Sequence, residues 1–160
     1  MTGRELPDLI PAGDRLVVDT SVVIAYFKGD EPISELATLV FEELIASERN
    51  PAVLSAVTVA EALVSPITAG GMALSTMRTF LLAFPGLAIR STDFLVAAEA
   101  ARLRAAAGIS MPDALVAATA TLTSSRWLIT NDRLLRDRLA SLASPVQVLV
   151  LGELAGDVPG

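Results

Sequence analysis

The amino-acid sequence predicts an α/β fold in three layers, with a twisted parallel sheet of about five strands and helices on both of its faces. Short apolar runs alternate along the chain with longer segments in which apolar residues recur at helical spacing. Strands that are separated by helices pair in parallel, and the helices cover the sheet. A chain of 160 residues fits one domain, which buries roughly 70% of its unfolded surface and needs no disulfide or metal to staple it.

The predicted strands are short apolar runs that are bounded by turn residues or by the start of a helix. In chain order they span 16–19, 53–57, 87–89, 127–130 and 146–151. The third of them follows a turn at Pro85-Gly86. Each run is bounded and too short to be a helix of ordinary length, which favours strands.

The predicted helices have apolar residues three and four positions apart. In chain order they span 22–28, 33–48, from about 58 onward, 72–84, 92–107, 110–124 and 133–142. Turn residues place their ends. Gly29-Asp30-Glu31-Pro32 and Asn50-Pro51 end the first two helices, Ser65-Pro66 is expected to interrupt the third, and Gly108 closes the alanine-rich helix.

The two ends of the chain carry no such pattern. Residues 1–14 are expected to form an N-terminal tail, 15–151 the domain, and 152–160 a C-terminal tail. The N-terminal residues include acids and prolines and lack an apolar core, which argues against a signal peptide. No apolar run reaches the roughly 18 residues that span a bilayer. We therefore expect a cytoplasmic protein with no membrane partner.

Composition excludes several kinds of site. The chain has no cysteine and no histidine, which excludes thiol nucleophiles, Ser-His-Asp catalysis and structural zinc of the usual kind. The net charge of −6 argues against simple electrostatic wrapping of nucleic acid, although acids that hold a cation contribute to the same count. Hydrophobic residues make up 52% of the chain and the mean hydropathy is +0.58, which indicates surplus apolar surface for a protein partner.

Four acidic residues lie where strands of the predicted sheet give way to helices or where a helix opens. Asp19 ends the first strand, Glu61 lies one turn into the helix after the second, Asp113 opens a helix, and Asp132 follows the fourth strand. Active residues in such sheets gather at the carboxyl ends of the strands. Carboxylates brought together raise each other's pKa unless a cation intervenes. Oxygen ligands without histidine or cysteine favour Mg²⁺ or Mn²⁺.

Each acid taken alone also has a local explanation at a helix end. Thr58-Val-Ala-Glu61 and Ser110-Met-Pro-Asp113 both have the spacing of a capping box. Asn131 or Asp132 could cap the helix that follows. Asp19 fits this explanation least, because the two hydroxyl residues after it could cap as well. From these residues alone, separate helix caps and a shared metal site both remain open.

The segments LVVDTSVVIAYF, TVAEAL, MPDALVAATA and WLITND, in that order and spacing, resemble a PIN domain, and more narrowly the VapC-type toxins of bacterial toxin–antitoxin pairs. The resemblance covers roughly residues 15–151. It implies a twisted parallel sheet with helices on both sides. It also implies a metal-dependent ribonuclease, a hydrolase that acts on single-stranded or looped RNA.

The resemblance further implies a role for each matching residue. The catalytic acids would be Asp19, Glu61, Asp113 and Asp132. The ligands of one or two Mg²⁺ (or Mn²⁺) ions would be Asp19, Asp113 and Asp132. The residues that orient these ligands would be Ser21, Thr130 and Asn131. A metal-bound water would attack phosphorus in line, and the products would carry a 5′-phosphate and a 3′-hydroxyl.

Partners follow from the arginines and from the resemblance. Arg126, Arg133 and Arg136 lie around the last motif and could contact RNA phosphates, or could simply belong to a solvated helix face. The resemblance implies a homodimer and a cognate antitoxin that neutralises the toxin. The helices within 33–48 and 71–84 are candidate surfaces for them, although their apolar residues could equally be core. The alternatives are an RNA-processing PIN nuclease outside a toxin pair and a non-catalytic binding module with the same fold.

Overall fold

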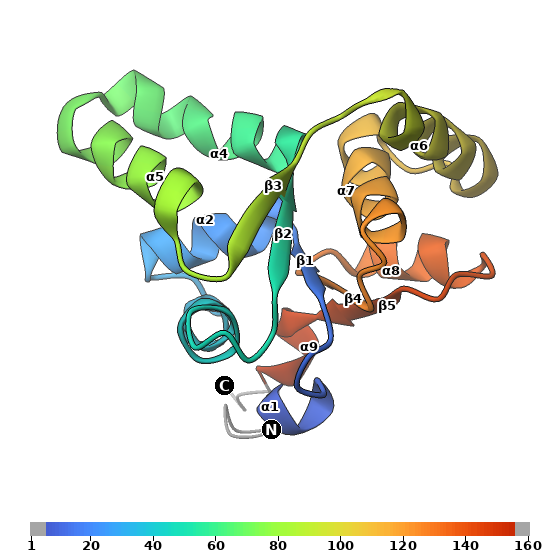
Figure 1. Cartoon of the computed structure of the whole chain (residues 1–160), viewed down its shortest axis with the longest axis horizontal. Coiled ribbons are helices and arrows are strands. Elements are labelled where there is room, and N and C mark those ends of the chain that lie inside the picture. Colours follow the sequence, from blue (N-terminus) through green and yellow to red (C-terminus); the bar gives the residue numbers. More distant parts are fainter. Residues whose placement is uncertain (1–5, 156–160) are drawn as a thin grey trace.

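The sheet contains five parallel strands in the order β3-β2-β1-β4-β5 in the computed structural model, which describes residues 6–155. The strands are β1 (Leu16–Val18), β2 (Ala52–Ser55), β3 (Leu87–Arg90), β4 (Trp127–Thr130) and β5 (Gln147–Val150). Figure 1 shows the pair α4 and α5 to one side of the strands and the pair α6 and α7 to the other. The predicted three-layer α/β fold is confirmed.

One or more helices follow each strand along the chain, and α1 precedes the first strand. Before β3 they are α1 (Leu6–Leu9), α2 (Thr20–Lys28), α3 (Ser34–Thr38), the π-helix η1 (Leu39–Ile45), α4 (Ala56–Ala69) and α5 (Gly71–Ala83). After β3 they are α6 (Phe94–Ala107), α7 (Met111–Leu122), α8 (Arg133–Ala140) and α9 (Leu151–Leu154). Within the described chain no single helix has the length and apolar character to cross a membrane. The bent pair α6 and α7, whose axes differ by 119°, meets that requirement only when its two helices are taken together.

The central strand β1 is buried on both faces, and its alternate residues enter two separate cores. Leu16 and Val18 pack in the core that α2, η1 and α5 cover. Val17 packs in the opposite core, which α6 and α7 cover with Val96 and Ala117. Because both of its faces are covered, β1 is apolar throughout, as is typical of strands in parallel sheets.

Most predicted bounds differ from the observed ones by one or two residues, and two segments differ in a larger way. The interruption predicted at Ser65-Pro66 is wrong, because Pro66 lies inside α4, which continues to Ala69. A proline removes one backbone donor, and α4 ends soon afterwards at Gly70, whose N–H binds the carbonyl of Pro66 at 2.8 Å. The segment predicted as one helix over 33–48 is divided into α3 and η1, a π-helical stretch of 7 residues.

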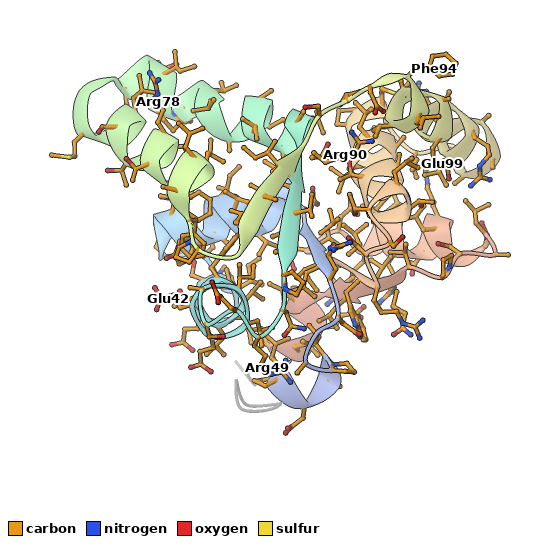
Figure 2. The ribbon with its side chains drawn as sticks, viewed as in Figure 1. Glu42, Arg49, Arg78, Arg90, Phe94 and Glu99 are labelled. Atoms are coloured by element: carbon orange, nitrogen blue, oxygen red, sulfur yellow. The ribbon has the colours of Figure 1, made fainter. Side chains whose placement is uncertain are left out.

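Residues 6–14, which the sequence analysis places in an N-terminal tail, pack against the rest of the domain. Leu6 and Ile10 are buried in the core that contains β1. The guanidinium of Arg49 donates to the carbonyl of Pro7 at 2.7 Å and to that of Ile10 at 2.8 Å. Figure 2 shows Arg49 close to α1. The short apolar pattern of this segment gave no periodic signal from which its packing could be predicted.

Asn50 holds the end of the same segment. Its side chain is fully buried, and its Nδ2 donates to the carbonyl of Pro11 at 2.8 Å and to that of Asp14 at 2.9 Å. The carboxylate of Asp14 in turn accepts from the indole Nε1 of Trp127 at 2.9 Å. The first described segment is therefore tied to both halves of the sheet.

Substitution of Asn50 by alanine is expected to lower the free energy of unfolding by about 2 to 3 kcal/mol, because two backbone carbonyls lose their buried donor. Urea unfolding followed by circular dichroism measures the change. Asn131, the other asparagine of the chain, has an exposed side chain and provides the matched control, Asn131→Ala. Equal losses in the two variants would contradict the structural role of the Asn50 amide.

Candidate acidic site at the carboxyl edge of the sheet

Three neighbouring strands deliver the candidate residues to one edge of the sheet. β1 pairs in parallel with β2 on one side and with β4 on the other, so their carboxyl ends lie side by side. Asp19 follows β1, α4 with Glu61 follows β2, and Asp132 follows β4. The arrangement agrees with the expectation that these acids lie at the carboxyl ends of the strands.

The carboxylate of Asp19 is buried and held by hydrogen bonds from two directions. The side chain is 8% exposed and caps the N-terminus of α2, with Oδ1 accepting from the backbone N–H of Thr20 at 2.7 Å. Its Oδ2 accepts from the hydroxyl of Thr130, at the end of β4, at 2.7 Å. The hydroxyl of Ser21 lies 3.4 Å from the same oxygen. These bonds fix the carboxylate between two strands.

The surroundings of Asp19 favour its uncharged form. Burial raises the pKa of Asp19 above its ordinary value of 3.8, and the hydrogen bonds from Thr130 and from the Thr20 N–H offset part of that rise. The carboxylates of Asp113 and Glu61 raise the pKa of Asp19 further, because both lie near enough to repel its charge. Asp113 and Glu61 therefore lie close enough to Asp19 for their charges to affect it.

Glu61 is held by a hydroxyl of α2 and does not complete a capping box. Ser55, whose Oγ accepts from the N–H of Val57 at 3.4 Å, caps α4, so the predicted cap at Thr58 is wrong. The hydroxyl of Thr20 instead donates to Oε1 of Glu61 at 2.9 Å and lies 3.2 Å from Oγ1 of Thr58. Thr20 thus links Asp19, through its backbone N–H, with Glu61, through its side chain.

Asp113 lies in the first turn of α7. Ser110 caps this helix by accepting from the N–H of Asp113 at 3.3 Å, so the first half of the predicted capping box is present. The carboxylate of Asp113 makes no hydrogen bond or ion pair with the described residues. Its side chain is therefore not held by another group of the described chain.

Asp132 has a cap function and a link to Asp19. Its Oδ1 accepts from the N–H of Leu135 at 3.0 Å and caps α8, as the local explanation predicted. Its backbone N–H donates to Oγ1 of Thr130 at 3.1 Å, and this hydroxyl donates in turn to Asp19. Thr130 therefore joins the backbone of Asp132 to the buried carboxylate.

Asn131 makes two further hydrogen bonds at the site. Its backbone N–H donates to the hydroxyl of Ser21 at 3.2 Å, and its Oδ1 accepts from the N–H of Gly152 at 2.9 Å. Neither Thr20 nor Gly152 was predicted from the sequence as a site residue. Thr20 could have been found as a second hydroxyl after Asp19, whereas Gly152 lay in a predicted tail and gave no signal.

An open depression of about 620 Å³ gives access to this edge. It is lined by Asp19, Ser21, Asn131, Asp132, Arg133, Leu134 and Gly152. Glu61 and Asp113 are not part of this lining, although both influence Asp19. The structure thus brings Asp19 and Asp132 together at the depression and places the other two acids close to Asp19 outside its lining.

The donor set suits a hard divalent cation that retains much of its water. Between residues 6 and 155 no group of three acidic side chains is positioned to hold one metal ion. In the same part of the chain none of the four acids forms an ion pair with a basic residue. Mg²⁺ usually binds through one or two carboxylates and completes its shell with waters and substrate phosphates. Asp19 and a neighbouring acid fit that mode.

The three candidate arginines occupy different places. Arg126 lies at the amino end of β4, so the length of the strand separates it from the site, and it does not contribute to the acidic edge. Arg133 lines the depression and is paired with Glu153 at 3.6 Å. Arg136 is paired with both Asp137 and Glu153. Arg133 is the arginine placed to meet a ligand there.

The fold and the site define an α/β domain whose acidic residues lie at the carboxyl ends of adjacent parallel strands. The family model of the PIN domain matches residues 16–138. The chain therefore belongs to the PIN domain family, which confirms the resemblance noted in its four motifs. A comparison with curated proteins returns no significant match.

Solved structures with the same fold include toxins of toxin–antitoxin pairs. FitAcB from Neisseria gonorrhoeae has a TM-score of 0.66 and 24% identity, over 86% of this chain and 98% of that one. A toxin–antitoxin complex from Klebsiella pneumoniae has a TM-score of 0.61 and 21% identity, over 82% and 98%. VapC20 of Mycobacterium tuberculosis, described as a sarcin–ricin loop cleaving toxin, has a TM-score of 0.62 and 15% identity, over 82% and 98%.

The raised pKa of Asp19 predicts how stability depends on pH in the metal-free protein. Because the folded state binds the Asp19 proton more tightly than the unfolded chain does, ionisation of Asp19 lowers stability as pH rises from 3.8 through the folded pKa. In EDTA, the stability of Asp19→Asn relative to wild type is therefore expected to increase with pH over that window. Urea unfolding at a series of pH values measures it.

Asp19→Asn carries no charge at any pH, so the pH dependence of the stability difference reports the ionisation of Asp19. A stability difference that stays constant between about pH 3 and about pH 7, a range that includes the ordinary pKa of aspartate, would contradict the raised pKa.

Proposed function

We propose that this protein is a metal-dependent ribonuclease that hydrolyses phosphodiester bonds of single-stranded or looped RNA and acts as the toxin of a toxin–antitoxin pair. Proteins of the PIN domain family are generally nucleases. The observation that carries the proposal is the buried carboxylate of Asp19, which has Asp113 and Glu61 near it and no cationic side chain paired with it among the described residues.

Asp19 and Asp113 are proposed to hold a divalent cation, Mg²⁺ or Mn²⁺, with Asp132 and Glu61 contributing directly or through water. Oxygen donors without histidine or cysteine suit these ions. When bound, such an ion would make water a nucleophile at neutral pH and would offset the negative charge that builds on the phosphate.

The residues of the chain hold this arrangement in place. Thr130 and the N–H of Thr20 stabilise the ionised form of Asp19, which is the form that binds a cation. Thr20 orients Glu61 from the other side. In the proposed reaction the oxygen of water bonds to phosphorus, and the 3′-oxygen leaves and takes up a proton. The products carry a 5′-phosphate and a 3′-hydroxyl.

An apolar groove supports the proposal of a protein partner. It has a volume of about 490 Å³ and lies between α4, α5 and β3. Leu82 and Ile67, which line it, are 76% and 60% exposed. We therefore propose the helix within 71–84 as a surface for an antitoxin or for a second copy of the chain, and several chains of similar fold come from toxin–antitoxin complexes.

The second candidate surface, within 33–48, is not retained. Its apolar residues Leu36, Val40, Phe41, Leu44 and Ile45 are buried in the core. The exposed side of this segment carries acids, among them Glu42 and Glu43. The expectation that these apolar faces could be ordinary core is therefore confirmed for this segment.

Gene context distinguishes the toxin from an RNA-processing nuclease of the same family. A short reading frame directly upstream that encodes a DNA-binding protein supports the toxin. A rise in melting temperature with Mg²⁺ that depends on Asp113 distinguishes both kinds of nuclease from a non-catalytic binding module.

Incubation of the protein with total RNA and Mg²⁺ is expected to produce new 5′-phosphorylated ends, which sequencing of the 5′ ends maps. Asp19→Asn and Asp113→Ala should each slow cleavage by at least about a hundred-fold, the usual cost of removing a group that stabilises transition-state charge. EDTA should abolish cleavage.

The matched control is Asp30→Ala, which removes an exposed aspartate from the loop after α2 and should leave the rate unchanged. Cleavage that persists at the wild-type rate in Asp19→Asn, or that continues in EDTA, would refute the proposed function.

Mg²⁺ is also expected to raise the melting temperature, because an ion that binds the folded state stabilises it by about 2.7 kcal/mol at a hundred times its dissociation constant. Differential scanning calorimetry over a range of Mg²⁺ concentrations measures this shift. Asp113→Ala should reduce it and Asp30→Ala should not. An equal shift in all three proteins would indicate a general ionic effect and would favour a non-catalytic module.

A further inference from the structure

The short helix α9 lies against the acidic site and is anchored both in the core and to α8. Leu151 is fully buried. Glu153 forms ion pairs with Arg133, at 3.6 Å, and with Arg136 of α8. Between them, Gly152 lines the depression that contains Asp19 and Asp132. This turn therefore forms one wall of the site.

The surroundings of Gly152 leave no room for a side chain. Its backbone φ lies outside the left-handed region that favours glycine. A Cβ atom at this position would lie 2.6 Å from Oδ1 of Asn131 and 3.7 Å from its Cγ. The obstructing atoms belong to the end of a side chain, so a larger residue at 152 displaces the Asn131 amide and leaves the backbone in place.

The contact with Gly152 determines which way the amide of Asn131 faces. A backbone N–H can only donate, so the atom that meets it at 2.9 Å must be the amide oxygen. The NH₂ group then occupies the other end of the amide. Within residues 6–155 this NH₂ group has no hydrogen-bond partner, and Asn131 lines the depression beside the two aspartates.

We propose that Gly152 is a positioning residue of the site. Its N–H and its lack of a side chain hold the Asn131 amide so that the NH₂ group donates to a phosphate oxygen of RNA. This inference rests on the proposed function and adds to it a specific phosphate contact. The ionised aspartates in the depression accept hydrogen bonds and cannot donate them. The amide NH₂ group beside them is a neutral donor, so it can bind a phosphate oxygen of RNA and does not compete with the aspartates for a cation.

The test is a double-mutant cycle on RNA cleavage with Gly152→Ala, Asn131→Ala and the double variant. Gly152→Ala and Asn131→Ala are each expected to raise KM about five-fold, the factor that corresponds to one ordinary hydrogen bond, with a smaller change in kcat. The double variant should be no worse than Asn131→Ala alone, because both changes remove one interaction. Fluorescence anisotropy with a labelled single-stranded RNA in EDTA should show the same order of affinities without cleavage.

Melting curves show whether each variant is folded, and Asn131→Ala, which leaves Gly152 and the backbone intact, tests the phosphate contact even if Gly152→Ala does not fold. Wild-type KM in Asn131→Ala, or in a folded Gly152→Ala, overturns the inference while leaving the ribonuclease proposal standing. Increases in KM that multiply in the double variant also overturn the inference, because they would show that the two residues act independently. A wild-type protein that neither binds nor cleaves RNA refutes the proposed function and this inference together.

Discussion

The burial of one carboxylate at the end of the central strand is the constraint on which the site depends. A carboxylate withdrawn from water is costly unless donors compensate for its lost hydration. Asp19 receives a backbone N–H from the helix that it caps and a hydroxyl from the neighbouring strand β4. Burial and two nearby acids nevertheless raise the pKa of Asp19. A cation bound at this point would therefore be stabilised by the surrounding negative charge.

The order of the strands makes this arrangement available. Because β1 lies between β2 and β4, the residues after these strands meet without long loops. Two threonines form hydrogen bonds between these neighbouring segments. Thr130 connects the buried carboxylate with the backbone of Asp132, and Thr20 connects the helix after β1 with Glu61 on α4. Hydroxyl groups suit this task because one oxygen can both donate and accept.

The fold, and the positions of Asp19, Glu61 and Asp132 after strands of the sheet, could be predicted from the sequence, because both depend on patterns that are local. The strand at 127–130 and the helix end at Gly108 have the predicted bounds, since an apolar run and a left-handed glycine each act within a few residues. The cap of α4 could not be predicted in this way. Ser55 and Thr58 are both good caps, and the end of β2 decides between them, which is a property of the sheet.

Contacts between distant segments were the other part that the sequence did not reveal. Nothing in the residues around Gly152 indicates that Asn131 lies against it, because the contact arises only when β5 pairs with β4. The same applies to residues 6–14, whose carbonyls are bound by Arg49 and Asn50. A polar side chain that binds a remote backbone leaves no periodic signal.

These distant contacts extend the packed domain beyond the region that matches the family. The family match begins at residue 16 and ends at 138, yet β5 pairs with β4 along its whole length and the segment before β1 fills the donors of a buried amide. A fragment trimmed to the match would expose the backbone of β4 as a bare edge, which invites pairing with other chains. The packed domain of this chain therefore extends beyond both ends of the region that matches the family.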